Sequence, residues 1–351
     1  MNATPLSDYA KQLAVTQEIS RLNFEVALGP LKAYLQDPAT QDIAVNPDGK
    51  IWVNRGSQGK LRSPEIMPSA ARQTLIGMLA NRQSTTIDRL RSRLEADLPY
   101  YDVRVQAFGP PIADWPLCLR CHASEVHPLR ANQSMFTKAA TVKDSLTVEN
   151  QPEGLLEALE AAIARGDNIA IVGRPGAGKT TLLNSILHEA ARIRPTARLV
   201  TVEDRHELRP SHADALQLYA RVEQAHYDGT RFEYGFVNLL SDVLRTSFDM
   251  LAFGELRDGE SALALLMALN CGTSGFSFTL HANSAFDALS RLEDLIRLAK
   301  APVIRRTIAR FVNTIVYLEM DDDRTRRVAG MVRVLGVDEN DEYIVAKNGN
   351  M

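Results

Sequence analysis

Cysteine is scarce in this chain, which has only three among its 351 residues. Three cysteines cannot form a disulfide framework, and such low usage is typical of a reducing compartment. Cys118 and Cys121, followed by His122, do match the Cys-x-x-Cys-His pattern of covalent haem attachment. That attachment requires export, and a zinc site would need two further ligands that His127 alone does not supply. We therefore interpret the pattern as a chance match.

Long apolar runs are missing as well. The most apolar stretch, residues 262–269, is far shorter than the roughly 20 residues that a membrane-spanning helix needs. Asp8, Lys11 and Glu18 lie where a secretory signal would be purely apolar. We expect no transmembrane segment and a cytoplasmic protein, which would be peripheral at the inner membrane if it works there.

A surplus of charge of one sign is also absent, since the formal net charge is −3. This balance excludes a surface that is basic throughout, as in a protein that wraps DNA, although a local basic channel remains open. Hydrophobic residues make up 45% of the chain and charged residues 24%. The chain is long enough for two domains, each with a buried core.

The first third of the chain combines short alternating runs with many turn signals. Residues 42–45 and 51–53 flank an Asn-Pro-Asp-Gly turn, which predicts a β-hairpin. Residues 104–108 alternate again, and a further strand is expected at residues 117–121. We predict a smaller α+β domain over residues 1–135, followed by a polar linker over residues 136–152.

After residue 153 the pattern changes to strand, loop and helix in repetition. A helix is expected from residue 153 to 165 and ends at a glycine. Short β-rich runs without polar alternation are typical of strands that are covered on both faces, as in a parallel sheet. These runs are residues 168–172, 198–203, 249–253 and 276–280, and a closing hairpin is expected from 315–318 and 328–335. We predict an α/β fold, a RecA-like P-loop NTPase domain with a parallel doubly wound sheet, over residues 153–351.

The strongest motif directly follows the first of these strands. It reads G-x-x-x-x-G-K-T and opens a helix, which is the context in which this motif binds a phosphate tail. Glycines let successive backbone N–H groups face a phosphate, and the helix N-terminus adds its dipole. Lys179 is expected to bridge the β- and γ-phosphates, and the Thr180 hydroxyl to hold Mg²⁺. The predicted nucleotide-binding residues here are Gly173, Arg174, Pro175, Gly176, Ala177, Gly178, Lys179, Thr180 and Thr181.

Three later segments carry polar residues at strand ends. Carboxylates at the end of a parallel strand face the ligand crevice, which favours a role for Glu203, although an acidic loop alone would be only a solvated turn. Glu255 follows a buried strand and could orient a water for attack on the γ-phosphoryl group or help to order Mg²⁺. A histidine after a strand is more often structural than catalytic. Because His281 follows a strand of the same sheet as the phosphate-binding loop, a functional role is favoured.

These four segments, in this order, resemble the secretion and pilus traffic ATPases of the type II/IV secretion superfamily. Within it they are most similar to the conjugation and type IV secretion branch, including the TrbB-like proteins. The resemblance also covers residues 28–31, 37–38 and 46–53 in the first domain and residues 284–293 after the histidine. It departs from the family at Gly272-Thr273, where a Gly-His pair is usual.

The resemblance implies the roles of individual residues. Glu203 and Glu207 match the acidic box, Glu255 the catalytic Walker B glutamate, and His281 the histidine of the His box. Three arginines match family positions that reach the phosphates or complete the site: Arg104, Arg120 and Arg245. A guanidinium delivered to the leaving phosphates would stabilise their growing charge, whereas an arginine taken alone is more often part of a surface salt bridge.

The resemblance further implies a hexameric ring that binds ATP and Mg²⁺ between its two domains. The expected function is an ATPase that energises a bacterial type IV secretion or conjugal DNA transfer machine, with membrane-embedded apparatus proteins as partners. A pilus-assembly motor of the same superfamily would share every catalytic residue. A nucleic-acid-translocating ring would instead show ATPase stimulation by DNA and a pore lined by lysine or arginine. A scaffold that binds ATP with little turnover is the third alternative.

Overall fold

The computed structural model describes residues 5–121, 126–137, 154–222, 233–269, 274–321 and 325–347. The chain divides into two compact units, and of the described residues 5–121 belong to the first and 126–347 to the second. The predicted domain boundary at residue 135 falls inside the second unit. Leu129, Met135 and Phe136 explain this difference, because they are buried in a core of the second unit. Of the predicted linker, residues 138–153 lie outside the described part of the chain.

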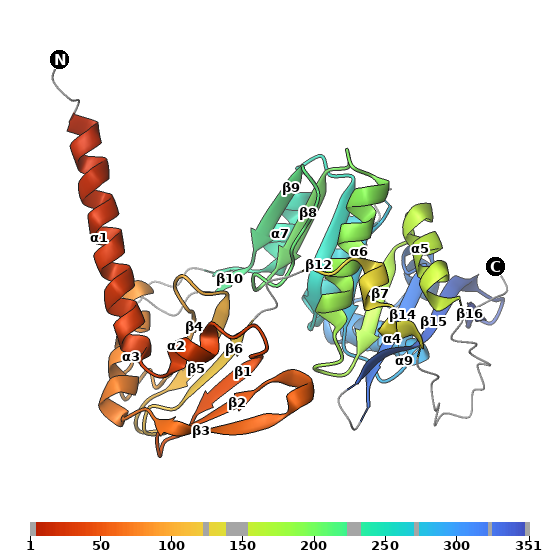
Figure 1. Cartoon of the computed structure of the whole chain (residues 1–351). Coiled ribbons are helices and arrows are strands. Elements are labelled where there is room, and N and C mark those ends of the chain that lie inside the picture. The colour runs from red at the N-terminus through yellow and green to blue at the C-terminus, as the bar shows by residue number, and fades with distance from the viewer. Residues whose placement is uncertain are drawn as a thin grey trace. The chain divides into compact units, whose positions relative to one another are not determined.

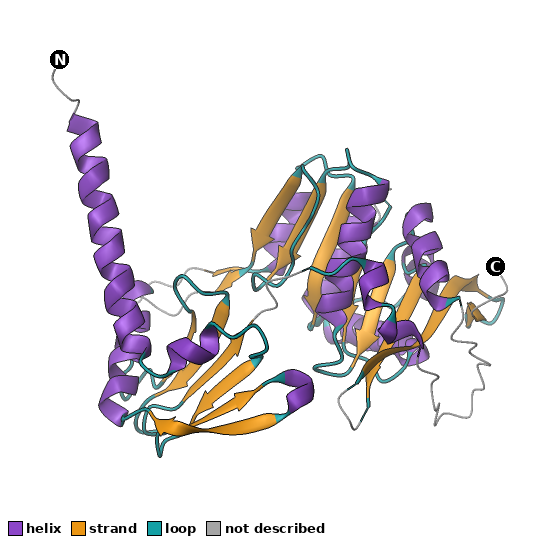
Figure 2. Ribbon diagram, in the orientation of Figure 1, coloured by secondary structure: helices purple, strands orange, loops and turns teal. Residues whose placement is uncertain are grey.

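The first unit is a six-stranded antiparallel sheet with helices against it (Figures 1 and 2). Its strand order is β3-β2-β1-β6-β5-β4. The predicted hairpin is confirmed, since Asp42 pairs with Asn54 and Val45 with Ile51. The elements are α1 (Pro5–Leu28), α2 (Leu31–Leu35), β1 (Asp42–Val45), β2 (Lys50–Asn54), β3 (Lys60–Ile66), α3 (Ser69–Arg82), β4 (Arg93–Asp97), β5 (Val103–Phe108) and β6 (Leu117–Cys121), with a 3₁₀ turn at Gly56–Gln58.

One face of this sheet carries the core of the first unit. Burial alternates along β1, β2 and β5, as expected of strands with one covered face. The apolar side of α3 packs on that face through Leu75, Ile76 and Leu79. Helix α1, which the sequence patterns did not predict, adds Phe24 and Leu28 from its last turns.

The second unit is an eight-stranded sheet in the order β16-β15-β14-β7-β13-β12-β8-β9. The strands from β14 to β9 in this order pair in parallel, whereas β15 and β16 are antiparallel. The strands are β7 (Ile169–Gly173), β8 (Leu199–Glu203), β9 (Ala215–Tyr219), β12 (Met250–Leu256), β13 (Ser277–Leu280), β14 (Thr314–Met320), β15 (Arg326–Val337) and β16 (Tyr343–Lys347), with a separate ribbon of β10 (Arg221–Val222) and β11 (Glu233–Tyr234).

Helices cover both faces of this second sheet, and each face has its own core. One core packs α5 and α6 under the sheet, and the other packs α7, α8, α9 and α10. The helices are α4 (Ser134–Thr137), α5 (Leu155–Arg165), α6 (Lys179–Ile193), α7 (Phe236–Val243), α8 (Gly259–Leu269), α9 (Ala285–Leu298) and α10 (Arg305–Phe311), and a 3₁₀ turn spans Leu129–Asn132. The predicted strands are present, and β7, β8 and β13 are buried along their whole length, as expected of strands covered twice.

Candidate nucleotide-binding site

The predicted phosphate-binding loop connects β7 to α6. Gly176 and Gly178 adopt φ angles of 80° and 94°, which a residue with a side chain rarely adopts. Gly173 lies so close to β14 that a Cβ atom there would be 2.4 Å from the Leu318 carbonyl oxygen. The loop therefore depends on its glycines, and α6 begins at Lys179 directly after it.

Lys179 points back into the loop. Its Nζ donates to the carbonyl oxygens of Gly173 at 3.1 Å and Arg174 at 3.3 Å, and it lies 3.0 Å from Nδ1 of His281. Burial lowers the pKa of Lys179 to about 8, although the nearby Glu255 carboxylate acts in the opposite direction. Among the described residues no carboxylate forms an ion pair with this ammonium, so it is available to an anionic ligand.

His281 joins the loop to the Walker B strand β12. Its Nε2 lies 2.5 Å from Oε1 of Glu255, while Nδ1 faces the Lys179 ammonium. Nδ1 also lies 3.2 Å from the Gly173 carbonyl oxygen. In the tautomer in which Nδ1 accepts from the Lys179 ammonium, Nε2 carries the proton that is donated to Glu255. Lys179, His281 and Glu255 thus form a continuous hydrogen-bonded chain across β7, β13 and β12.

Glu255 is held from its other side by Arg257. Arg257 donates from Nε to Oε2 of Glu255 at 2.5 Å and from a terminal nitrogen to Asp204 at 2.9 Å. Burial alone would raise the pKa of Glu255, but the hydrogen bond from His281 and the charge and hydrogen bond of Arg257 lower it to about 2. Glu255 is therefore a carboxylate at neutral pH, with both oxygens engaged.

The acidic box lies at the end of β8, next to the first turn of α6. The Thr180 hydroxyl donates to Oε2 of Glu207 at 3.2 Å. Asn184, one turn further along α6, donates to the Glu207 carbonyl oxygen at 2.9 Å and fixes the position of this residue. A hydroxyl beside a carboxylate is the kind of oxygen set that Mg²⁺ binds, usually with several waters retained.

Glu203 is the most deeply buried acid of the site, with 2% of its surface exposed. Its Oε2 accepts from the backbone N–H groups of Glu207 at 3.0 Å and Leu208 at 2.9 Å, whereas Oε1 has no hydrogen-bond partner in the described part of the chain. Burial raises the pKa of Glu203 to about 8 despite these two bonds. Gly254 leaves room for it, since a Cβ there would lie 2.9 Å from that of Glu203. Glu203 therefore fixes the backbone of the acidic box at Glu207 and Leu208.

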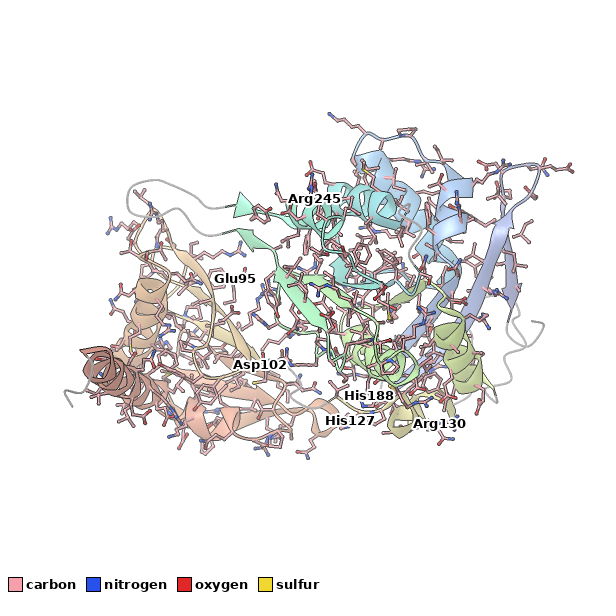
Figure 3. The ribbon with its side chains drawn as sticks, turned by 90° about the horizontal axis from the view of Figure 1, so that it is seen from above. Glu95, Asp102, His127, Arg130, His188 and Arg245 are labelled. Atoms are coloured by element: carbon pink, nitrogen blue, oxygen red, sulfur yellow. The ribbon has the colours of Figure 1, made fainter. Side chains whose placement is uncertain are left out.

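Arg104 and Arg120 belong to the first unit and are direct cross-strand partners on β5 and β6. Arg104 forms an ion pair with Glu95 at 2.9 Å, and Arg120 one with Asp42 at 3.0 Å. Figure 3 labels Glu95 on its strand. Both arginines are at least partly exposed on the face of the sheet that carries no core. Their action on phosphates remains a prediction.

Arg245 lies directly after α7, on the surface of the second unit (Figure 3). Its side chain is 74% exposed and contacts its own helix, through the Ser241 carbonyl oxygen at 3.1 Å and Asp242 at 3.5 Å. The structure therefore does not join Arg245 to the hydrogen-bonded chain that contains Lys179 and Glu255. The catalytic role of Arg245 also remains a prediction.

The Cys-x-x-Cys pair lies on β6, where neighbouring side chains alternate between faces. Cys118 is exposed, whereas Cys121 packs partly against the core of the first unit. Burial raises the pKa of Cys121 to about 11, which keeps it a thiol at neutral pH. Because the two sulfurs point to opposite faces, they cannot share one ligand. His122 and Gly272-Thr273 lie outside the described residues.

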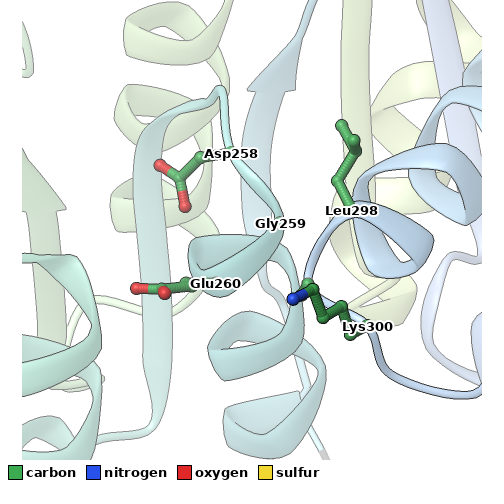
Figure 4. Close-up of a pocket in the computed structure, with 6 residues that line it drawn as sticks. Asp258, Gly259, Glu260, Leu298 and Lys300 are labelled. Atoms are coloured by element: carbon green, nitrogen blue, oxygen red, sulfur yellow. The ribbon is translucent and has the colours of Figure 1, made fainter.

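Two residues that the sequence patterns did not single out contact the site. Arg257 follows Glu255 by two positions, and this spacing at the end of a strand was a usable signal for a shared face. Asn184 follows Thr180 by one helical turn, which also places both on one face. A hollow at the start of α8 is shown in Figure 4, and its lining contains none of the predicted site residues; it is formed by Asp258, Gly259, Glu260, Leu298, Ala299 and Lys300.

A buried strand, a glycine loop with its lysine, and acids at the ends of β12 and β8 of the same sheet define a protein of the P-loop class. Comparison with known families identifies it more closely. Residues 123–319 match the family model described as type II/IV secretion system protein. The chain belongs to this family.

Individual relatives and structures agree with this assignment. The conjugal transfer protein TrbB of Rhizobium radiobacter is 31% identical over 307 residues, which cover 87% of each chain. The type IV secretion system protein VirB11 of Bartonella quintana is 26% identical over 77% of this chain and 80% of its own. The ATPase DotB of Legionella pneumophila has a similar fold, with a TM-score of 0.56 and 19% identity over 88% of this chain and 80% of that one.

Among the described residues, no helix combines the length and the apolar character that crossing a bilayer demands.

Proposed function

We propose that this chain is an ATP-hydrolysing motor that energises a type IV secretion or conjugal DNA transfer machine. The observation that carries the proposal is the hydrogen-bonded chain from Lys179 through His281 to Glu255. It links the residue that would sense the terminal phosphate to the residue that would activate water. Similarity to a conjugal transfer protein over 87% of the chain supports the choice of machine.

The residues of the second unit fit an Mg²⁺-bound triphosphate. The loop from Gly173 to Gly178 would present its N–H groups to the phosphates, and Lys179 would pair with the terminal ones. Thr180 would hold Mg²⁺ with Glu207 nearby, because their oxygens already lie 3.2 Å apart. When bound, the ion would neutralise charge on the phosphate oxygens. The buried ammonium of Lys179, which forms no ion pair with a carboxylate of the described segments, is the feature that an anion would satisfy best.

Hydrolysis would then depend on Glu255 as the base. The carboxylate is charged at neutral pH and could accept a proton from the attacking water. In this structure His281 and Arg257 donate hydrogen bonds to both oxygens of Glu255. One of these two residues must break its hydrogen bond before Glu255 can bind a water. Transfer of Lys179 from His281 to a phosphate would free Nδ1 and allow the histidine to turn. Glu203 would hold the acidic box in place through the backbone of Glu207 and Leu208.

We infer further that the second unit is a RecA-like domain with a doubly wound sheet, and that the protein assembles as a hexamer. Arg104, Arg120 and Arg245 would approach the phosphates only in the closed assembly, which is consistent with their present ion pairs. Hydrolysis would move the first unit relative to the second and so do work on a partner at the cytoplasmic face of the inner membrane.

Two measurements test the proposal. Purified wild-type protein should hydrolyse ATP, and a Glu255→Gln variant should not, while a Glu260→Gln variant on the exposed start of α8 serves as the matched control. In donor cells that lack the native gene, the wild type and the control should restore DNA transfer, and Glu255→Gln should fail. Hydrolysis that requires added DNA would favour the nucleic-acid-translocating ring. Equal turnover by the wild type and Glu255→Gln would favour the alternative of a scaffold that binds ATP with little turnover.

A further inference from the structure

Helix α1 presents two different apolar surfaces on opposite sides. Phe24 and Leu28 are buried in the core of the first unit, with exposed fractions of 2% and 0%. A second set of large apolar side chains is exposed by between 54% and 81%; it consists of Val15, Ile19, Leu22 and Val26. In Figure 1 the N-terminal part of α1 extends away from the other helices and the sheet of its unit. We refer to the four exposed residues as the α1 stripe.

The α1 stripe has the spacing of a coiled-coil seam. Its members are separated by four, three and four residues, so they line one side of a helix, about 180° from Phe24. This spacing assigns Ile19 and Val26 to the a positions of a heptad, and Val15 and Leu22 to the d positions. β-branched residues at a and leucine at d favour two parallel strands. We propose that the α1 stripe pairs with the α1 stripe of a second copy of this chain, as a parallel two-stranded coiled coil.

The charges beside the stripe select the parallel orientation. Glu18 and Glu25 both occupy g positions, on one flank of the stripe, and Asn23 occupies an e position on the other flank. In a parallel pair, Glu18 faces Asn23 of the second copy, whose amide can donate to it. In an antiparallel pair that matches all four apolar residues, Glu18 faces Glu25 of the second copy, a carboxylate that already pairs with Lys32 at 2.7 Å and Arg21 at 3.3 Å and has no donor to offer Glu18.

The same charges exclude a lipid surface as the occupant. A helix that lies on an anionic membrane carries lysine and arginine on its polar face. The charged residues of α1 are three acids and two bases: Asp8, Lys11, Glu18, Arg21 and Glu25. Within the stripe region Arg21 is the single base, and it already pairs with Glu25 at 3.3 Å. Two heptads bury a small area, so the pairing would add to other contacts between copies.

Cysteine cross-linking tests the pairing and its orientation. In a variant with Cys118, Cys121 and Cys271 replaced by serine, Leu22→Cys should form a covalent dimer under mild oxidation. The matched control is Gln17→Cys, which is exposed on the opposite side of α1 and should not form one. Absence of the Leu22→Cys dimer would overturn the proposal. A disulfide between Val15→Cys and Val26→Cys chains, mixed in equal amounts, would indicate the antiparallel pair and also overturn it.

Sedimentation of the unmodified full-length chain provides the second measurement. Leu22→Glu should weaken self-association by about tenfold or more, because the two introduced carboxylates would face each other at a d position. Gln17→Glu should have no effect. If the wild type instead floats with anionic lipid vesicles and Leu22→Glu does not, a membrane covers the stripe and the proposal is wrong. The stripe belongs to the first unit and the nucleotide-binding residues Lys179, Thr180 and Glu255 to the second, so this outcome leaves the proposed ATPase function intact.

Discussion

The two sheets of the molecule place their chemistry in different ways. In the second unit the central strands are buried completely, and the polar residues gather where parallel strands end. In the first unit the strands are antiparallel with one covered face, and the polar residues lie along the open face. There they form a row across the sheet in which each residue pairs with the next: Asn54, Asp42, Arg120, Arg104 and Asp97.

This contrast suggests that the two units contribute differently to hydrolysis. The parallel sheet brings a lysine, a histidine and acids into one hydrogen-bonded network within a single unit. The antiparallel sheet presents two adjacent arginines whose charges are balanced within the sheet itself. We therefore expect substitutions in the second unit to remove the chemical step, and substitutions in the first unit to reduce it only partly.

Loss of the Lys179 ammonium should have the largest effect. A Lys179→Ala variant should lose more than about a hundredfold in hydrolysis, because the ammonium that reaches into the loop would no longer stabilise the charge of the phosphates. Phosphate release from ATP measures it. Circular dichroism checks that the variant is folded. Full turnover by the variant would refute the phosphate-binding assignment.

Replacement of the base should slow the chemistry and leave binding intact. Glu255→Gln keeps the shape of the side chain but cannot accept a proton, so kcat should fall by about 10²–10⁴-fold. The dissociation constant for ATP should change little. Single-turnover hydrolysis and calorimetric titration separate the two effects. Unaltered turnover would remove Glu255 from the mechanism.

The arginines of the first unit should matter less. Arg104→Gln and Arg120→Gln should each lower kcat of the assembled protein by about 10–100-fold, the range of one hydrogen bond to a charged group. Arg93→Gln is the control, since Arg93 also pairs with Glu95 but is not among the arginines expected to reach the phosphates. If all three variants have the same kcat, Arg104 and Arg120 have no special role in hydrolysis. Only the second unit would then contribute to the chemical step.

The smallest expected effect concerns pH. Lys179 has a pKa of about 8 without ligand and is protonated below it. Phosphates bind the charged form, so binding above that pH must take up a proton, and the affinity for ATP should fall about tenfold from about pH 7 to about pH 9. Titration calorimetry in two buffers detects the proton. Glu203→Gln should keep this dependence, because Glu203 shares a pKa of about 8 but lies outside the lysine's contacts. Loss of the dependence in that variant would assign the titration to Glu203.

Patterns in the sequence predicted the parts of the fold that local rules determine. The hairpin of β1 and β2 follows from its turn residues, and β7 follows from an apolar run before the glycine loop. Helix α1 was missed because its apolar residues are divided between two opposite faces, which weakens the helical period. Strands β9 and β16 were missed because they are edge strands that bury little.

The site was predictable to the same degree. The loop, Glu203, Glu255 and His281 all follow buried strands, and parallel pairing brings the ends of such strands together. The bridge from Arg257 to Asp204 could not be predicted, because it requires knowing that β12 lies next to β8. The state of Glu203 also depends on burial that only the packed structure defines.

A structure of the full chain with Mg²⁺ and a non-hydrolysable ATP analogue would test the central claim most directly. The terminal phosphate should lie on Lys179 and the metal ion on Thr180, and the His281 side chain should no longer accept from the lysine. A nucleotide bound elsewhere, with the lysine still hydrogen-bonded to His281 and to the Gly173 carbonyl oxygen, would contradict it.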